Sequence, residues 1–271
     1  MIRQAAKNLV LDALTSAIGD AKGRVTLPVI AGPGRGLRFS FDLSRRIEAA
    51  YVTGRYDVAQ VRTMARLVRR GMVVWDVGTY LGFYSALASR LVGHTGRVIA
   101  FEPDPENLER ARHNAALNSL SNIQFVQAAI GEPVGEIKLV KTANTNSHIE
   151  GAFVGSDRDD YSTRAVRASE VLTVRCMSLD EAFTDPSIAN PDFIKLDIEG
   201  AEQFALMHAD RLATELSPTI MLELHNPECD RAAWEFSKRT GYQLLSLETN
   251  RYFARAEEVH GTVLCTMGRT A

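Results

Sequence analysis

The sequence predicts an α/β protein whose doubly wound sheet has helices on both faces. An apolar run of strand length, residues 73–77, leads through a glycine turn into a helical pattern over residues 84–92. A second apolar run, residues 98–101, ends in Glu102. Further along the chain, strand-like runs alternate with helical patterns, which is the order of elements in a doubly wound sheet.

The glycine turn has the pattern Asp-x-Gly-x-x-x-Gly at Asp76, Gly78 and Gly82. Glycine lets the backbone turn sharply and lets a ligand approach without a Cβ in the way, and the following helix start offers unpaired N–H donors. Because Asp76 stands where the dinucleotide fingerprint has its first glycine, the turn suits a cationic ligand better than a pyrophosphate. Glu102 is placed to accept hydrogen bonds from ribose hydroxyls.

These features favour S-adenosylmethionine over a nicotinamide dinucleotide, because that cofactor carries an ammonium and a sulfonium but no phosphate. The alternative is that Gly78 and Gly82 only make a tight turn between a strand and a helix. Glu102 is then a solvated strand end.

The chain of 271 residues is long enough for one large α/β domain with a small addition at its N-terminus. Hydrophobic residues at 45% and charged residues at 24% exclude disorder. Residues 1–71 hold 13 Lys and Arg against 5 Asp and Glu, a net charge of +8, so the rest carries −10. The basic segment is typical of a solvated helix face, or alternatively meets an acidic substrate or a membrane surface. We therefore divide the chain into an extension, residues 1–71, for substrate or dimer contacts, and a ligand-binding domain, residues 72–271.

The cysteines Cys176, Cys229 and Cys265 are far apart and lack neighbouring histidines, which argues against a disulfide framework and a structural zinc site. No apolar run approaches the roughly 20 residues of a membrane span. Residues 1–18 predict a short amphipathic helix without the apolar core and cleavage site of a signal peptide. We expect a cytoplasmic protein with no membrane partner and no nucleic-acid partner. A homodimer could form through the N-terminal segment.

Before the glycine turn, residues 23–42 place glycine and proline between short β-prone pieces, which predicts a hairpin or irregular ribbon. Residues 45–54 and 58–70 have helical patterns, joined at residues 54–57. We expect this joint to lie near the glycine turn.

After Glu102, a helix is predicted to residue 117, because proline and acidic residues suit its first turn. A third strand follows at residues 123–126, then a strand at 135–140 and a long polar loop at 141–173, which is typical of a lid or binding segment. The residues after the third strand are small or uncharged and leave room for a flat adenine ring: Gln127, Ala128 and Ala129.

A second informative stretch is a strand, residues 193–196, that ends in the carboxylates Asp197, Glu199 and Glu202. They lie where open α/β sheets bind ligands, and could act as a general base, as metal ligands or as anchors for the methionine ammonium. Alternatively, Glu199 and Glu202 only favour the start of a helix at residues 201–209. The strand at 219–224 is followed by His225, which neighbouring strand ends bring within reach of Asp197. The remaining patterns predict a helix and three strands, at 230–240, 242–247, 251–254 and 261–267.

Four blocks in this order resemble the FkbM family of S-adenosylmethionine-dependent methyltransferases over about residues 51–247. They read Val-Trp-Asp-Val-Gly-Thr-Tyr-Leu-Gly-Phe-Tyr, Phe-Glu-Pro-Asp-Pro-Glu-Asn, Ile-Lys-Leu-Asp-Ile-Glu-Gly-Ala-Glu and Leu-Glu-Leu-His. The resemblance implies a Rossmann-like class I sheet of seven strands whose last strand is antiparallel. It also implies methyl transfer, usually to a hydroxyl of a sugar, polyketide or other specialised metabolite.

Within the resemblance, each cofactor region has a counterpart in this chain. Glu102 would bind the ribose, and Asp197 would face the transferring methyl group. The family commonly has Ala-Asn where this chain has Thr79-Tyr80. The other expected cofactor contacts are Asp76, Gly78, Thr79, Gly82 and Phe83 around the methionine end, Pro103 beside the ribose, and Gln127, Ala128 and Ala129 at the adenine.

The predicted catalytic residues are Asp197, His225 and Glu199. Methyl transfer is an in-line displacement, so the protein must align the reactants, and a hydroxyl must also lose its proton. Asp197 or His225 would take that proton, while Glu199 shapes the site or helps to bind a divalent metal such as Mg²⁺, a need that the sequence leaves open. The acceptor would be a small molecule.

Three other functions remain as alternatives. An RNA methyltransferase shares the cofactor turn, but the acidic body and the lack of an Asn-Pro-Pro-Tyr-like block argue against it. A nicotinamide oxidoreductase conflicts with Asp76 at the first glycine position. A non-catalytic scaffold conflicts with the intact carboxylates at the strand ends.

Overall fold

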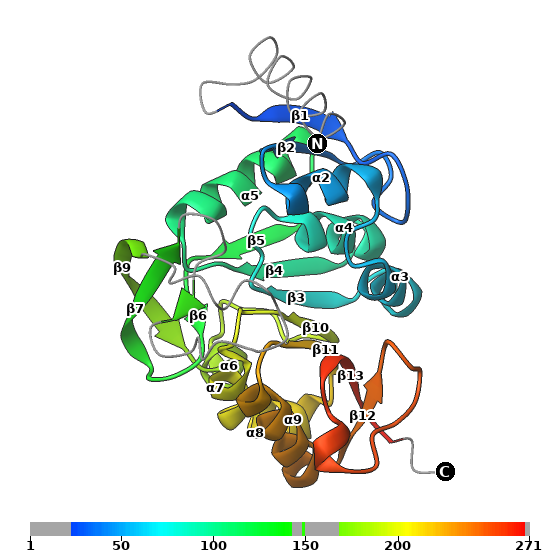
Figure 1. Ribbon diagram of the computed structural model, residues 1–271, viewed down its shortest axis with the longest axis vertical. Helices are drawn as coiled ribbons and strands as arrows, with labels where there is room; N and C mark the ends of the chain where they lie inside the picture. Colours follow the sequence, from blue (N-terminus) through cyan, green and yellow to red (C-terminus); the bar gives the residue numbers. More distant parts are fainter. Residues whose placement is uncertain (1–22, 143–147, 150–167, 269–271) are drawn as a thin grey trace, which may run out of the picture.

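A seven-stranded sheet forms the centre of the computed structural model, which describes residues 23–142, 148–149 and 168–268 (Figure 1). The predicted helix at residues 1–18 lies outside these residues. From edge to edge the sheet runs β12 (Tyr242–Ser246), β13 (Gly261–Met267), β11 (Thr219–Leu224), β10 (Phe193–Leu196), β3 (Val73–Val77), β4 (Arg97–Phe101) and β5 (Ile123–Val126).

Strand directions confirm the predicted doubly wound class. β13 runs antiparallel to its neighbours β11 and β12, while β11, β10, β3, β4 and β5 pair in parallel. The chain builds outward from β3 to β5 in one direction and from β10 in the other, so the strand order reverses between β3 and β10. Open sheets of this kind bind ligands outside the carboxyl ends of the strands at that point.

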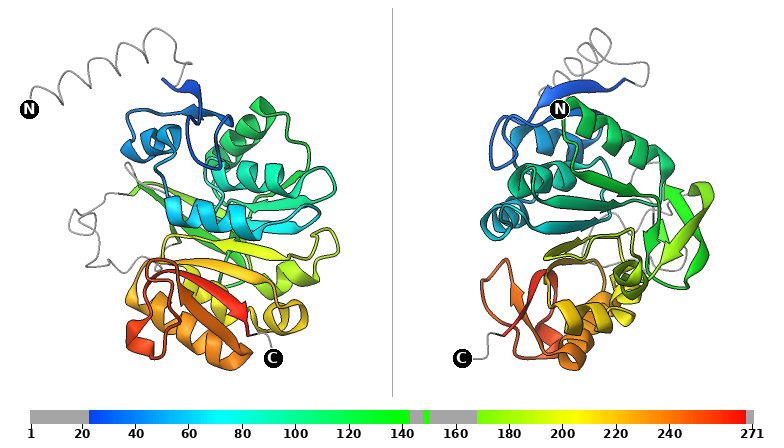
Figure 2. Two further views of the ribbon diagram at one scale, coloured as in Figure 1. Left: turned by 90° about the vertical axis from the view of Figure 1, so that its right-hand side faces the viewer. Right: turned by 180° about the vertical axis from the view of Figure 1, so that it is seen from behind.

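Helices cover both faces of the sheet because alternate residues of each strand point to opposite sides (Figure 2). Val74 faces a core shared with α3 (Val58–Leu67) and α4 (Phe83–Val92). Trp75 faces the second core, formed with helices of the C-terminal half. These are α6 (Leu179–Thr184), α7 (Glu202–Met207), α8 (Asp210–Leu216) and α9 (Pro227–Thr240).

The described part of the N-terminal extension belongs to the same body as the sheet. β1 (Val25–Pro28) and β2 (Arg38–Phe41) form the predicted hairpin, and α2 (Arg46–Thr53) follows. Phe39 and Phe41 are fully buried in the core that contains Val74. The hairpin is also tied to α5 (Pro105–Leu117), because the Ser40 amide donates to Asn114 Oδ1 at 2.8 Å.

The predicted loop at residues 141–173 is wrong at both ends. β7 (Gly135–Thr142) and β9 (Ala168–Met177) are long antiparallel strands. They form a separate four-stranded sheet with β6 (Ala129–Ile130) and β8 (His148–Ile149) at its edges. Val174 and Cys176 are buried, whereas the intervening Thr173 and Arg175 are exposed. This alternation of buried and exposed residues indicates a strand. The polar residues that precede it favoured the prediction of a loop.

The predicted helix at residues 201–209 is shorter, since α7 ends at Met207 and a second helix, α8, begins at Asp210. Asp180 causes the break, because its carboxylate accepts from the Arg211 and Leu212 amides at 3.3 and 2.8 Å in the first turn of α8. The predicted strand at residues 251–254 is also wrong. Tyr252 makes an isolated bridge to Leu245 of β12, after which the chain turns into η1 (Ala256–Glu258).

Among the described residues, the helices are all too short or too polar to cross a membrane.

Candidate functional site

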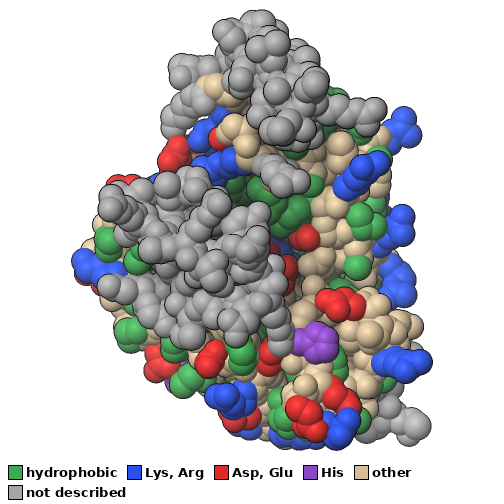
Figure 3. Space-filling model, in the orientation of Figure 1, with side chains coloured by type: hydrophobic (Ala, Val, Ile, Leu, Met, Phe, Trp, Pro, Cys, Tyr) green, Lys and Arg blue, Asp and Glu red, His purple; other side chains and the backbone are tan. Residues whose placement is uncertain are grey.

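A cavity opens at the carboxyl ends of β3, β4 and β10, beside the point where the strand order reverses. It encloses about 820 Å³, part of which is open to solvent. In the space-filling view, a hollow with hydrophobic side chains in its depth and acidic side chains beside it marks this region (Figure 3). Its residues come from the glycine turn, the tip of β4, the β6 strand, the β10 end and the N-terminal extension.

The glycine turn closes on the protein itself. Gly78 has φ +84°, and a Cβ there would lie 1.9 Å from the carbonyl oxygen of Asp197. Gly82 also has φ +84°, and its Cβ would meet the Ala111 Cβ at 3.1 Å. The amides of Gly78 and Thr79 both donate to the Phe101 carbonyl at 3.1 Å. Neighbouring elements of the protein therefore also require glycine at both positions. The expectation that the glycines make room for a ligand stays a prediction.

The buried carboxylate of Asp76 stabilises this turn through hydrogen bonds. Its side chain is fully buried, and Oδ2 accepts from Thr79 Oγ1 at 2.7 Å and Ser85 Oγ at 2.5 Å. Burial raises the pKa of Asp76. Three predicted cofactor residues do not line the cavity in the described part of the chain: Asp76, Gly82 and Gln127. Their direct contact with a cofactor stays a prediction.

Tyr80, at the position where the family commonly has Asn, links the turn to the N-terminal extension. Its φ is +50°, a conformation that Asn tolerates better than Tyr. The Tyr80 hydroxyl donates to Glu48 Oε1 at 2.9 Å and accepts from Arg45 Nη1 at 3.0 Å. Arg110 completes this buried group by pairing with Glu48. The larger side chain thus links the glycine turn to α2 through hydrogen bonds.

Glu102 lies at the tip of β4, where the sequence placed it, and lines the cavity together with Pro103. Its Oε2 accepts from the Tyr80 amide at 2.8 Å, and Oε1 accepts from the Asp104 amide at 3.1 Å. Burial outweighs these hydrogen bonds and raises the pKa of Glu102 to about 7. The carboxylate is therefore held in one orientation at the cavity wall.

Beside Glu102, the cavity wall is apolar. Ala128 and Ala129 line it as predicted, together with Phe101, Ile130 and Leu139. Leu139 comes from β7, which lies in the segment after the third strand, so the separate four-stranded sheet completes this wall. A flat aromatic base fits between small and branched apolar side chains of this kind.

At the other end of the cavity, Asp197, Glu199 and His225 come together as the sequence predicted. His225 Nε2 lies 3.5 Å from Asp197 Oδ1 and 3.8 Å from Glu199 Oε2. His225 Nδ1 lies 3.0 Å from Oε1 of Glu202, which is fully buried. Asp197 and Glu199 line the cavity, and the His225 side chain is 23% exposed beside them.

The charges of this cluster shift the pKa values of the two predicted bases in opposite directions. Burial opposes the shift, but Lys195 and His225 hold the pKa of Asp197 below its usual value. Burial likewise opposes ionisation of the imidazole, yet Glu202, followed by Asp197 and Glu199, raises the pKa of His225 well above its usual value. Asp197 therefore favours its carboxylate form more than a free aspartate does, and His225 holds its proton more tightly than a free imidazole does. That one of these two residues serves as the general base stays a prediction.

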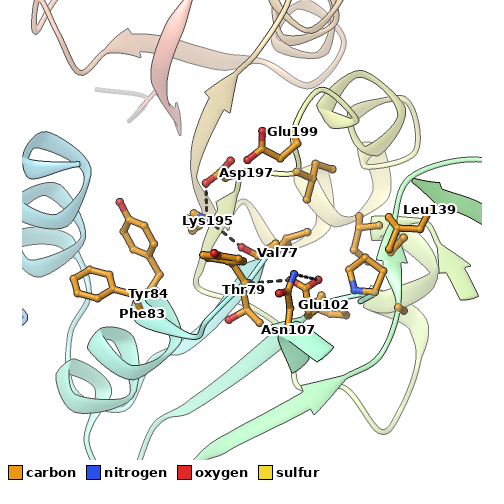
Figure 4. Close-up of a pocket in the computed structure, with 18 of the residues that line it drawn as sticks. Val77, Thr79, Phe83, Tyr84, Glu102, Asn107, Leu139, Lys195, Asp197 and Glu199 are labelled. Carbon is orange, nitrogen blue, oxygen red and sulfur yellow. Dashed lines mark hydrogen bonds and ion pairs between the residues drawn. The ribbon is translucent and has the colours of Figure 1, made fainter. Parts of the chain in front are cut away.

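Lys195 is a site residue to which the sequence reasoning assigned no role. Its Nζ lies 2.9 Å from Asp197 Oδ2 and donates to the Gly78 carbonyl at 3.4 Å, and it lies 4.8 Å from the centre of the Tyr84 ring. Lys195 therefore joins the glycine turn to the acidic cluster (Figure 4). The available signal was its spacing, because residues two apart on a strand share a face.

An aromatic wall from the extension was also missed. Tyr51 and Tyr56 line the cavity opposite the apolar wall, with ring centres 3.9 Å apart, and the Tyr51 ring lies 4.6 Å from that of Phe83. Phe83 was predicted as a cofactor contact and does line the cavity. The predicted joint at residues 54–57 near the glycine turn is confirmed, because Asp57 accepts from the Tyr84 hydroxyl at 3.2 Å.

A parallel sheet with a reversed last strand, a glycine turn after β3 and an acidic tip on β4 define a Rossmann-like, S-adenosylmethionine-dependent methyltransferase. The family model described as the methyltransferase FkbM domain matches residues 76–248. The chain therefore belongs to the FkbM methyltransferase family.

Two similar proteins are named as methyltransferases. Hexuronic acid methyltransferase AglP of Haloferax volcanii is 24% identical over 182 residues, which cover 66% of this chain and 67% of that protein. Methyltransferase sdnD of Sordaria araneosa is 23% identical over 211 residues, covering 70% of this chain and 80% of that protein. The crystal structure of methyltransferase FkbM from Methylobacillus flagellatus KT is 19% identical with a TM-score of 0.46, and the match covers 74% of this chain but 45% of that one.

Proposed function

We propose that the protein transfers the methyl group of S-adenosylmethionine to a hydroxyl group of a small molecule, with a sugar as the first class to test. The observation that carries this proposal is that one cavity is lined by the Glu102 carboxylate, the apolar wall, Asp197 and Glu199, with His225 next to the two acids. Membership of the FkbM family supports it, as does the similarity to a protein named as a hexuronic acid methyltransferase.

The residues present fit the cofactor. Glu102 presents a buried, oriented carboxylate that can accept hydrogen bonds from two ribose hydroxyls. Ala128, Ala129 and Leu139 would enclose the adenine, and the turn at Thr79 would receive the methionine end. S-adenosylmethionine supplies an electrophilic methyl carbon on its sulfonium.

The task of the protein is to align the acceptor oxygen with that carbon and to exclude water. Proximity and orientation can supply roughly 7–11 kcal/mol of the barrier. Lys195 holds Asp197 Oδ2, which leaves Oδ1 to accept a hydrogen bond from the acceptor hydroxyl. The hydroxyl oxygen forms the new bond to carbon, the carbon–sulfur bond breaks, and the hydroxyl proton passes to the acidic cluster and then to solvent.

The aromatic wall would hold the carbon skeleton of the acceptor. Tyr51, Tyr56 and Phe83 form a cluster of rings at the cavity surface, and aromatic faces pack well against the apolar side of a sugar ring. The acceptor thus lies between rings from the extension and acids from the sheet.

Calorimetry with S-adenosylhomocysteine, followed by transfer assays on a panel of hydroxyl compounds, tests the proposal. The panel should hold neutral sugars, hexuronic acids and polyketide alcohols, and the product should be analysed by mass and NMR. An O-methyl product is expected from at least one of them. Absence of cofactor binding at about millimolar concentration, or methylation at nitrogen, carbon or sulfur instead, would contradict the proposal.

A further inference from the structure

The spacing of the donor atoms in the acidic cluster is unusual for hydrogen bonding. His225 Nε2 lies 3.5 and 3.8 Å from oxygens of Asp197 and Glu199, and one donor atom from each residue lies within 4.8 Å of the others. Good N–H···O bonds measure about 2.7–3.2 Å. Two atoms that bind one metal ion at about 2.0–2.2 Å lie about 3.3–4.4 Å apart when the angle at the ion is tetrahedral or wider. The observed separations match a shared ion better than direct hydrogen bonds.

His225 is held in the orientation that metal binding needs. Its Nδ1 lies 3.0 Å from Glu202 Oε1. Glu202 is itself fixed, because its carboxylate is fully buried and accepts from the Ile198 and Gly200 amides at 2.8 and 3.0 Å. When Nδ1–H donates to Glu202, Nε2 is the nitrogen that faces Asp197 and Glu199, and a metal ion bound there would replace the Nε2 proton. A histidine ligand almost always has such a carboxylate or carbonyl behind it.

The two carboxylates are also directed toward the same point. Asp197 uses Oδ2 for Lys195, at 2.9 Å, which leaves Oδ1 toward His225. Glu199 has φ +55°, a conformation that costs a residue with a Cβ and is found preferentially at functional sites. Because both residues line the cavity, an ion between them and His225 would be open to the cavity on one side.

We propose that Asp197, Glu199 and His225 bind one divalent transition-metal ion of the Mn²⁺, Fe²⁺ or Zn²⁺ type, with Glu202 as the positioning residue behind the histidine. The imidazole favours such an ion over Mg²⁺, which prefers oxygen ligands and keeps several waters. Three protein ligands leave positions for the acceptor hydroxyl. This role of the ion rests on the proposed function, whereas its binding does not.

The ion would supply what the cluster alone lacks. A hydroxyl bound to a divalent ion loses its proton more readily than a free one. Held by Asp197, Glu199 and His225, the ion would thus orient the acceptor hydroxyl and favour loss of its proton to solvent.

Metal binding can be measured without any acceptor. Protein stripped of metal by a chelator is titrated with Mn²⁺, and free Mn²⁺ is followed by its electron paramagnetic resonance signal. We expect one Mn²⁺ per chain. Glu199→Gln, which removes a ligand on a partly exposed side chain, should weaken binding by at least about tenfold, and Glu202→Gln should weaken it about 10–100-fold. Glu215→Gln on the surface of α8 is the matched control and should leave Mn²⁺ binding unchanged.

Calorimetry with S-adenosylhomocysteine shows that each variant is folded. The proposal is overturned if the wild-type protein binds neither Mn²⁺ nor Zn²⁺ at about 1 mM, or if Glu199→Gln binds Mn²⁺ as the wild type does. The two proposals fail separately. Methyl transfer that proceeds unchanged in excess chelator overturns the role of the ion in the reaction and leaves the proposed methyl transfer intact. Bound Mn²⁺ without transfer to any hydroxyl overturns the proposed acceptor and leaves the metal site intact.

Discussion

The two ends of the cavity are built in different ways. At the end that we propose for the cofactor, the backbone closes on itself, because the amides of Gly78 and Thr79 pair with Phe101 and both glycines are pressed against neighbouring elements. At the end that we propose for the acceptor, side chains from distant segments make the site: rings from α2 and the joint after it, acids from the end of β10, and His225 from the end of β11. Lys195 connects the two ends.

This contrast shows why the ends tolerate change differently. A close-packed turn depends on residues that fit one backbone path, so its substitutions should alter stability and cofactor binding together. Side chains that project into a cavity can change without moving the sheet, so their substitutions should alter the acceptor or the rate. The following variants test whether the effects at the two ends are separate.

The largest effect is expected from Asp197→Asn at the acceptor end. Loss of this carboxylate should lower kcat by about 10²–10⁴-fold, because both proton removal and alignment of the acceptor depend on it. Affinity for S-adenosylhomocysteine should stay within about threefold of the wild type if the two ends are separable. Steady-state kinetics and calorimetry check this, with the exposed Glu257→Gln as control. An unchanged kcat would remove Asp197 from the reaction.

Gly78→Ala should show the rigidity of the cofactor end. The added Cβ would lie 1.9 Å from the Asp197 carbonyl at a φ of +84°, whereas Gly36 has a similar φ of +87° and nothing within 4 Å. Gly78→Ala should lower the free energy of unfolding by about 2–4 kcal/mol, the sum of conformational strain and overpacking. Gly36→Ala should cost only the strain, about 1–2 kcal/mol. Urea unfolding compares them, and equal losses would mean that the close approach to Asp197 carries no energy.

Glu102 should make cofactor binding depend on pH. Burial raises its pKa to about 7, so the folded protein holds this proton more tightly than the unfolded chain does. Its contribution to stability is complete below the usual pKa of 4.5 and is lost as the pH rises toward about 7. Ribose hydroxyls favour the carboxylate, so S-adenosylhomocysteine should bind about tenfold more weakly at pH 6 than at pH 8.

Glu102→Gln is the control for this pH dependence, because the amide does not titrate. Its affinity for S-adenosylhomocysteine should be the same at both pH values and about tenfold below that of the wild type at pH 8. Calorimetry at pH 6 and pH 8 makes the comparison. A wild-type affinity that does not change with pH would place the ribose away from Glu102.

The smallest effect should come from the aromatic wall. Tyr56→Leu removes one ring of the pair with Tyr51, which should raise the acceptor KM about 3–10-fold, consistent with about 0.5–1.5 kcal/mol for an aromatic contact. The affinity for S-adenosylhomocysteine should not change, and Tyr252→Leu on the surface should change neither quantity. A loss of cofactor affinity in Tyr56→Leu would show that the wall belongs to the cofactor end.

The contrast between the two ends also explains what could be predicted from the sequence. The sequence showed the candidate cofactor contacts Asp76, Gly78, Gly82 and Glu102, because a turn with these demands on backbone and space allows few residue types. Their detailed roles were less accessible, since only the fold shows that Asp197 occupies the space beside Gly78.

The remaining parts depend on contacts between segments far apart in the chain. Tyr51 and Tyr56 gave no signal of their own, because their place at the cavity comes from the packing of α2 against α4. β9 had a readable alternation, but the polar residues before it favoured a loop. Lys195 stood inside a recognised block, yet its contact with Gly78 depends on the pairing of β10 with β3.

A crystal structure of the complex with S-adenosylhomocysteine is the most direct test of the central claim, that the nucleoside lies along β3 and β4 with its sulfur toward β10. We predict that both ribose hydroxyls lie within hydrogen-bonding distance of Glu102, that the adenine contacts Ala128 and Leu139, and that the sulfur faces Asp197. A ribose bound elsewhere, or a sulfur directed away from Asp197, would contradict the account.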